Sequence, residues 1–162
     1  MIRRKIANSE IEAIRPHGDE LLIFQDNLRE RREELGLRQV DIAEMLDISL
    51  STYARLENGS DAISELYYLA LYVAFNQIER GLPVDGGMDI QSFRDRLERI
   101  RNTYGLSAEN IATFIGMSRK GYWNLENGNA KFRLKHFLAI NAAINRLKQY
   151  LASGYIAEPV EC

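Results

Sequence analysis

Residues 35–59 read LGLRQVDIAEMLDISLSTYARLENG, and residues 104–128 repeat the pattern as YGLSAENIATFIGMSRKGYWNLENG. A shift of 69 positions aligns residues 24–59 with residues 93–128 without a gap, and 14 of the 36 aligned positions are identical. Most of the shared residues are apolar or turn residues, which is typical of two copies of one structural framework. The chain therefore contains an internal duplication.

Each copy of the repeat predicts a run of short helices. Apolar residues recur at helical spacing over residues 24–35, and Gly36 supplies the left-handed residue that commonly ends a helix. A second helix is predicted over residues 39–46. A third follows from Ser49, a suitable N-cap, to Glu57. The first copy thus predicts a helix, a short turn and a helix behind an initial helix.

A longer helical pattern follows each copy, over residues 62–79 and 131–151, and it is apolar on more than one face. Such a helix needs two partners, either the other repeat of the same chain or a second protomer. We therefore expect an all-α fold of two tandem units, each with about four helices and a long last helix. The expected divisions are an N-terminal arm 1–18 with a basic Arg3-Arg4-Lys5, a first unit 19–80, a linker 81–92, a second unit 93–152 and an acidic tail 153–162, with mobile ends.

The composition argues against several classes of protein. The single cysteine, Cys162, excludes an internal disulfide, and His17 and His136 are too few for a cysteine/histidine zinc site. The sequence lacks a phosphate-binding glycine loop and a Cys/His nucleophile pair, so we expect neither an enzyme nor a cofactor. No apolar run reaches the roughly 18 residues of a membrane span, so we expect a cytoplasmic protein with no membrane partner.

The repeated pattern resembles that of the phage repressor/Cro family, the XRE-type helix-turn-helix DNA-binding proteins. The resemblance is carried by residues 35–46, Ile48-Ser49 and the Leu-Glu-Asn-Gly at 56–59, and more weakly by the second copy. It implies that the third helix of each unit lies in the major groove of double-stranded DNA. The family's contact positions fall in the first copy on Gln39, Leu50, Ser51, Thr52, Arg55 and Asn58, and in the second on Ala108, Arg119, Lys120, Gly121, Asn124 and Asn127.

The resemblance also assigns a structural role to two pairs of charged residues. The family pairs an arginine on the first helix with the glutamate that ends the third, and Arg32/Glu57 and Arg101/Glu126 occupy these places. We expect bidentate pairs that clamp the two helices together. The buried core, rather than base stacking, is the expected place of Tyr53 and Tyr122.

The modest net charge of −2 hides an asymmetry between the units. Residues 24–80 carry 6 Lys and Arg against 11 Asp and Glu, a balance of −5, and residues 93–152 carry 11 against 4, a balance of +7. Since phosphate binding needs clustered cations, we hypothesise that the second unit supplies most of the attraction to DNA. The cations expected to do so are Arg119, Lys120, Lys131, Arg133 and Lys135.

The leading interpretation is a sequence-specific DNA-binding regulator that acts as a repressor, either as a homodimer or as an intramolecular pseudo-dimer. The alternative is a protein-interaction module of the same fold, an antitoxin or anti-activator that has lost or weakened DNA binding. Beside the acidic balance of the first unit, three features of the second copy favour the alternative. They are Ala108 in place of an amide, Gly121 inside the third helix, and Trp123 where the family has a position facing solvent or DNA.

Overall fold

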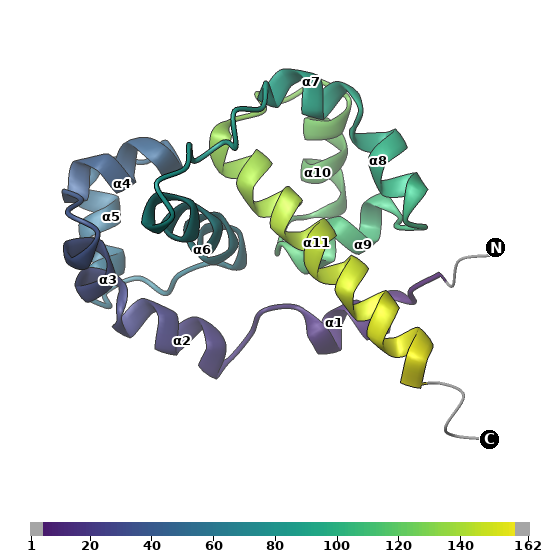
Figure 1. Cartoon of the computed structure of the whole chain (residues 1–162), viewed down its shortest axis with the longest axis horizontal. Coiled ribbons are helices and arrows are strands. Elements are labelled where there is room, and N and C mark those ends of the chain that lie inside the picture. The colour runs from purple at the N-terminus through teal and green to yellow at the C-terminus, as the bar shows by residue number, and fades with distance from the viewer. Residues whose placement is uncertain (1–4, 158–162) are drawn as a thin grey trace.

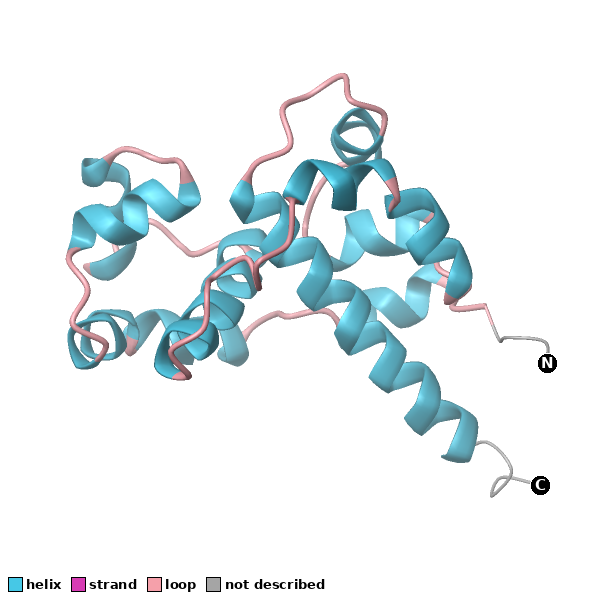
Figure 2. Cartoon of the chain, turned by 45° about the horizontal axis from the view of Figure 1, so that its top comes forward, coloured by secondary structure: helices cyan, strands magenta, loops and turns pink. Residues whose placement is uncertain are grey.

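The computed structural model describes residues 5–157 and the side chains of residues 5–153. Within this part the chain forms eleven helices and no strands, which confirms the all-α prediction (Figure 1, Figure 2). Arg3, Arg4, Cys162 and the end of the acidic tail lie outside the described residues. The helices are α1 (Asn8–Ile14), α2 (Asp19–Asp26), α3 (Leu28–Glu34), α4 (Gln39–Leu46), α5 (Leu50–Glu57), α6 (Glu65–Glu79), α7 (Ile90–Asp95), α8 (Leu97–Thr103), α9 (Ala108–Phe114), α10 (Arg119–Glu126) and α11 (Leu134–Ala157).

Helix boundaries follow the spacing of the sequence repeat. Helices α3, α4, α5 and α6 begin 69 residues before α8, α9, α10 and α11, respectively. We call α2–α6 the N-terminal unit and α7–α11 the C-terminal unit. Gly36 and Gly105 follow α3 and α8 with φ of 72° and 71°, in the left-handed conformation predicted for Gly36.

The first helix predicted for each unit is divided in two. Helix α2 ends before Asn27 and α7 ends before Arg96, and both residues leave helical geometry with ψ near 0°. Asn27 Nδ2 donates to the carbonyl of Ile23 (2.9 Å), and Arg96 Nε donates to the carbonyl of Ser92 (3.3 Å). The backbone N–H groups of Asn27 and Arg96 bond the same carbonyls (3.2 Å in each case), so each residue closes the last turn of its helix. The prediction of one continuous helix over residues 24–35 was therefore wrong.

The long helices α6 and α11 pack against each other and make the most extensive helix–helix contact in the described part of the chain. In Figure 1 they cross near the middle of the molecule, with α3 and α4 on one side and α8 and α9 on the other. The second partner that the apolar pattern required is thus the other unit of the same chain. A loop over residues 81–89 connects the units.

Helix α1 packs on α9 of the C-terminal unit, a helix that is far from it in the sequence. Ile6 and Ile11 are buried, and Asn110 Nδ2 donates to the carbonyl of Ile6 (3.3 Å). The Arg15 guanidinium donates to the carbonyl of Thr113 (3.3 Å). The expectation of a mobile arm is therefore wrong for this segment, because buried apolar side chains fix it in place.

None of the helices in the described residues combines the length and apolar character that crossing a membrane requires.

Candidate nucleic-acid interface

Helix α5 begins at a serine cap that leaves its first turn on the surface. Ser49 Oγ accepts a hydrogen bond from the Thr52 N–H (3.1 Å) and donates to Thr52 Oγ1 (2.8 Å). The next two side chains project outward, and Leu50 is 49% exposed. Capping one of the free N–H groups fixes the start of the helix and leaves its remaining donors accessible. The first turn of α5 therefore presents Leu50 and Ser51 to solvent, as a base-reading helix requires.

The far end of α5 is polar and internally paired. Arg55 Nε donates to Asp61 Oδ2 (2.7 Å), and both side chains are about half exposed. Asn58 Oδ1 accepts from the Ser60 N–H (2.9 Å). Arg55 is thus held by a carboxylate in this structure, and contact with a phosphate or a base requires it to exchange that partner.

A buried ion pair holds α5 to α3. Arg32 binds both oxygens of Glu57 (2.5 and 3.1 Å) and also donates to the carbonyl of Leu37 (2.7 Å). The Glu57 side chain has no exposed surface. Burial alone would raise the pKa of Glu57, but the hydrogen bond from Arg32 and other donors outweigh it and lower the pKa to about 2. The predicted clamp of helix one to helix three is confirmed.

The Gln39 amide belongs to the same buried cluster. Its Nε2 donates to Glu57 Oε1 (3.1 Å), so Gln39, one of the predicted DNA-contact residues, is partly buried against the clamp. A Gln39 amide that is already oriented loses little rotational freedom when a phosphate approaches.

Helix α10 repeats the construction of α5 with different surface residues. Ser118 Oγ accepts from the Gly121 N–H (3.0 Å), and Arg119 and Lys120 project into solvent. Arg119 is 80% exposed and lies 3.4 Å from Glu109, an ion pair of little energetic weight at that exposure. The first turn of α10 is therefore strongly cationic, while that of α5 is neutral.

The rest of α10 carries an exposed indole. Trp123 is 53% exposed, and its carbonyl accepts from Asn127 Nδ2 (2.9 Å). Asn124, the next residue of α10, is partly buried. The position of Trp123 is taken by Ala54 in α5, so the two helices present surfaces of different shape as well as different charge.

The clamp recurs in the C-terminal unit without the amide. Arg101 binds both oxygens of Glu126 (3.0 and 2.7 Å) and donates to the carbonyl of Leu106 (3.3 Å). Ala108 stands where Gln39 lies in the other unit and offers no side-chain donor. Both buried tyrosines, Tyr53 and Tyr122, pack in the core as predicted.

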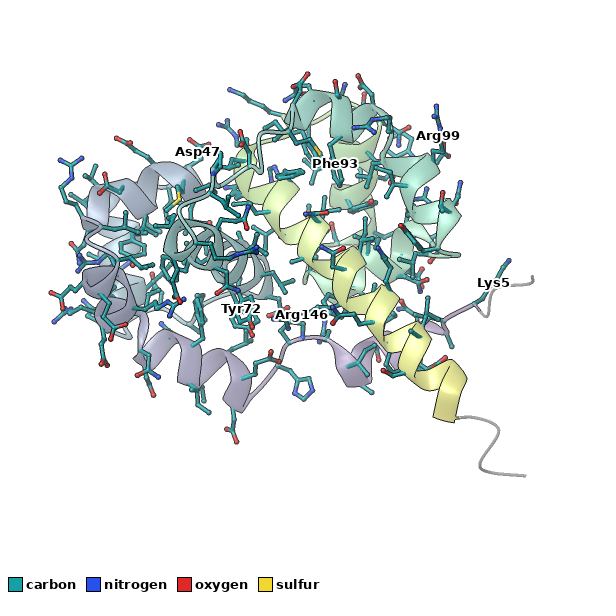
Figure 3. All side chains as sticks on the ribbon, viewed as in Figure 1. Lys5, Asp47, Tyr72, Phe93, Arg99 and Arg146 are labelled. Atoms are coloured by element: carbon teal, nitrogen blue, oxygen red, sulfur yellow. The ribbon has the colours of Figure 1, made fainter. Side chains whose placement is uncertain are left out.

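Two of the predicted phosphate-binding cations contact the other unit instead. Arg133 forms an ion pair with Asp47, and the Lys135 ammonium lies 5.7 Å from the centre of the Tyr67 ring. Burial lowers the pKa of Lys135. Figure 3 shows Asp47 on the side of the N-terminal unit that faces α11. Arg133 and Lys135 therefore have partners in the N-terminal unit, which sequence position alone did not show, and their attraction to DNA stays a prediction.

The structure also reveals a cation that the sequence analysis did not single out. Arg94 lies so close to Gly128 that a Cβ on the glycine would sit 2.8 Å from Arg94 Nη1. This places a guanidinium beside the end of α10. The alignment of the two repeats pairs Arg94 with Gln25 and could have indicated its position. Gln25 Nε2 donates to the carbonyls of Leu56 (2.8 Å) and Asp61 (2.6 Å) beside the end of α5.

An open groove of about 550 Å³ lies between α2–α3 and α6 and is lined by aromatic side chains such as Phe24 and Tyr68. The one acidic residue among its described lining residues, Glu20, already binds Arg146 (3.1 Å) and the Tyr68 hydroxyl (2.6 Å). Arg146 also lies 4.9 Å from the centre of the Tyr72 ring, and Figure 3 shows the two residues together. The groove does not present the pair of carboxylates that acid–base catalysis would use.

A helix-turn-helix family model matches residues 28–75, from the start of α3 to Phe75 in α6. This part of the N-terminal unit is therefore similar to the helix-turn-helix family, and the match covers less than half of the chain. No curated protein and no solved structure matches the chain.

Proposed function

We propose that the chain is a sequence-specific DNA-binding transcription regulator, a repressor, and that both units place a helix in the major groove, α5 from one and α10 from the other. The observation that carries this proposal is the matched pair of short surface helices. Each is capped by a serine, clamped to the core by a buried arginine–glutamate pair, and exposed at its first turn. Rigid supports of this kind position the readout residues of a helix-turn-helix protein.

The C-terminal unit supplies most of the electrostatic attraction in this proposal. Arg119 and Lys120 are exposed at the first turn of α10, and Lys131 is exposed after it. Arg94 lies beside the end of the helix and pairs with Asp95 (2.8 Å), so it adds a fourth cation by exchanging that partner for a phosphate. Neutralising phosphates with these groups releases counterions, so affinity falls as salt rises.

The N-terminal unit contributes contacts of another kind. In this proposal Leu50 contacts a thymine methyl group, and Ser51 and Thr52 hydrogen-bond base edges or phosphates. Arg55 reaches DNA by exchanging Asp61 for a phosphate or a guanine. The acidic balance of this unit makes its contacts selective rather than strongly attractive.

A direct test is binding of the full chain to fluorescently labelled duplexes of random sequence, about 30 bp or three helical turns long, measured by anisotropy. We expect binding at roughly 50 mM salt that weakens steeply on a log–log plot against salt. A folded chain that fails to shift the anisotropy at low salt would contradict the proposal.

The exposed Trp123 favours a second candidate, a module that binds another protein through α10. An indole half open to solvent is a typical anchor of protein interfaces. Trp123→Ala separates the two functions. If α10 binds DNA, this substitution changes the salt dependence of DNA affinity little. If it abolishes binding of a partner protein and leaves DNA affinity unchanged, Trp123 belongs to a protein-interaction surface.

A further inference from the structure

The two units are joined as if by the interface of a symmetric dimer. The residues of α6 that are buried are Tyr68, Leu69, Ala70, Leu71, Ala74 and Phe75, and each has a buried counterpart 69 positions later in α11, namely Phe137, Leu138, Ala139, Ile140, Ala143 and Ile144. Two alanines four residues apart recur in both helices, which allows the backbones to approach closely. The two long helices thus pack on each other and bury residues at matched positions.

Contacts at the edges of this interface are reciprocal. Asp47, in the turn between α4 and α5, pairs with Arg133 just before α11. Its counterpart in the second unit, Gly116, lies against the Glu65 carboxylate at the start of α6, with no room for a Cβ. The turn of each unit therefore contacts the start of the long helix of the other. Such exchange is the mark of an isologous, two-fold interface.

An aromatic ring pair inside the N-terminal unit has an equivalent pair inside the C-terminal unit. Phe24 meets Tyr68 edge-on with centroids 4.9 Å apart, and the equivalent Phe93 meets Phe137 edge-on at the same distance. The two units therefore have the same internal geometry as well as a shared interface. In Figure 1, α3 and α4 lie on one side of the crossing of α6 and α11, and their equivalents α8 and α9 lie on the other side.

The readout residues break this symmetry. Leu50, Ser51 and Arg55 of α5 stand where Arg119, Lys120 and Asn124 stand in α10. A homodimer presents two identical helices and so reads an inverted repeat. One chain of this protein presents two unlike helices in the geometry of a dimer.

We infer that a single chain reads one non-palindromic operator composed of two unlike half-sites. The inference deepens the proposed function and rests on it. The half-site under α10 takes guanine, read by Arg119 or Lys120, and adenine, read by Asn124. The half-site under α5 takes thymine against Leu50 and guanine against Arg55. The orientation of the operator then sets the orientation of the bound protein.

The test is repeated selection of bound duplexes from a random-sequence pool by the full chain, followed by native mass spectrometry of the selected complex. We expect two different half-sites about one helical turn apart and one chain per duplex. The selected site should bind at least about tenfold tighter than either palindrome built from two copies of one half. An inverted repeat, or two chains on each duplex, would overturn the inference while leaving DNA binding intact. If no sequence is enriched, the proposed function fails as well.

A swap of readout residues gives a second arm. The variant R119L/K120S/G121T/N124R carries the α5 residues on both helices, and it should select an inverted repeat of the α5 half-site. The reverse swap L50R/S51K/T52G/R55N should select the opposite palindrome and serves if the first variant does not fold. The control R96L/R99S removes two exposed cations, one just before α8 and one within it, both outside the readout helices, and should leave the motif unchanged. A swap variant that folds and still selects the wild-type motif would contradict the assignment of α5 and α10.

Discussion

Helices α4 and α9 occupy equivalent places in the two units, but within the described residues the N-terminal segment packs on the outer face of α9 and not on that of α4. On α4 the outer positions are Asp41 and Glu44, and Glu44 is exposed. On α9 the equivalent positions are Asn110 and Thr113, which bind the N-terminal segment that carries α1. A duplicated core is therefore compatible with one unit that keeps an open acidic face and another that incorporates the start of the chain. The units should differ in stability and charge while sharing their framework.

The largest difference is expected at the buried clamps. Arg32→Met leaves the Glu57 carboxylate buried without its bidentate partner, and we expect a loss of about 3–5 kcal/mol in the free energy of unfolding at pH 7. Arg101→Met should cost less, because 9% of the Glu126 side chain is exposed and that of Glu57 is not. Urea denaturation measures both values.

The sign of the pH effect checks the clamp prediction. In the wild type the depressed pKa of Glu57 stabilises the fold above the unfolded value near 4.5, and this stability is lost as the pH falls toward 2. In Arg32→Met, burial instead opposes ionisation, so the deficit relative to wild type should shrink in acid. A deficit that is the same at pH 7 and pH 3 would show that Glu57 is not the charge left unpaired.

The contact between α1 and α9 is the next largest. Ile11 is fully buried in it, so Ile11→Ala should cost roughly 2–4 kcal/mol through a cavity. The matched control is Leu22→Ala on α2, where the side chain is 55% exposed and the cost should stay within about 0.5 kcal/mol. Thermal unfolding followed by circular dichroism compares the two. Equal small losses would mean that α1 is not part of the folded C-terminal unit.

The first turns of α6 and α11 should respond differently to acid. Ser64 caps α6 by accepting from the Tyr67 N–H (3.2 Å), whereas Nδ1 of His136, the counterpart of Tyr67, accepts from the Arg133 N–H before α11 (2.9 Å). Burial and then the neighbouring Lys135 and Arg133 lower the pKa of His136 to about 4. The neutral ring therefore stabilises the fold above the unfolded pKa of about 6.5, and the stability is lost as the pH falls from there toward 4.

We expect about 2 kcal/mol of stability to be lost over this range, because the ring is partly open to solvent. His136→Gln keeps an acceptor for the Arg133 N–H but does not titrate. Its free energy of unfolding should be nearly flat between pH 6.5 and 4.5. If the variant and the wild type lose stability in parallel, another group is responsible.

The smallest expected effect concerns the amide that only one unit possesses. Ala108→Gln should strengthen DNA binding by roughly 2- to 10-fold, the value of about one hydrogen bond, and Gln39→Ala should weaken it by a similar factor. Ala108→Leu adds bulk without a donor and is the control. A gain with Leu equal to that with Gln would attribute the effect to packing.

Much of the framework could be predicted from the sequence because it depends on local rules. Ser49 as a cap, Gly36 as a stop and the Arg32/Glu57 pair follow from spacing and residue type alone. The breaks at Asn27 and Arg96 were missed because the apolar spacing that predicts a helix runs across both residues.

The contacts between distant parts of the chain were harder to predict. The apolar faces of the last helices required a partner but did not decide between a second unit and a second chain. The roles of Arg133 and Lys135 depend on where α11 crosses α6. The position of α1 was missed because it depends on contacts with α9, a helix that is far away in the sequence.

The central claim is that α10 provides the main electrostatic contact with DNA, and charge reversal tests it most directly. The variant Arg119→Glu with Lys120→Glu is compared with Arg96→Glu with Arg99→Glu, which reverses two exposed cations, one just before α8 and one within it. Figure 3 shows Arg99 at the outer surface of the molecule. The measurement is affinity for the selected duplex over a salt series. We predict that the α10 variant loses affinity and that its log–log salt slope falls by about 2, while the α8 variant keeps the wild-type slope. An α10 variant with unchanged affinity and slope would contradict the account.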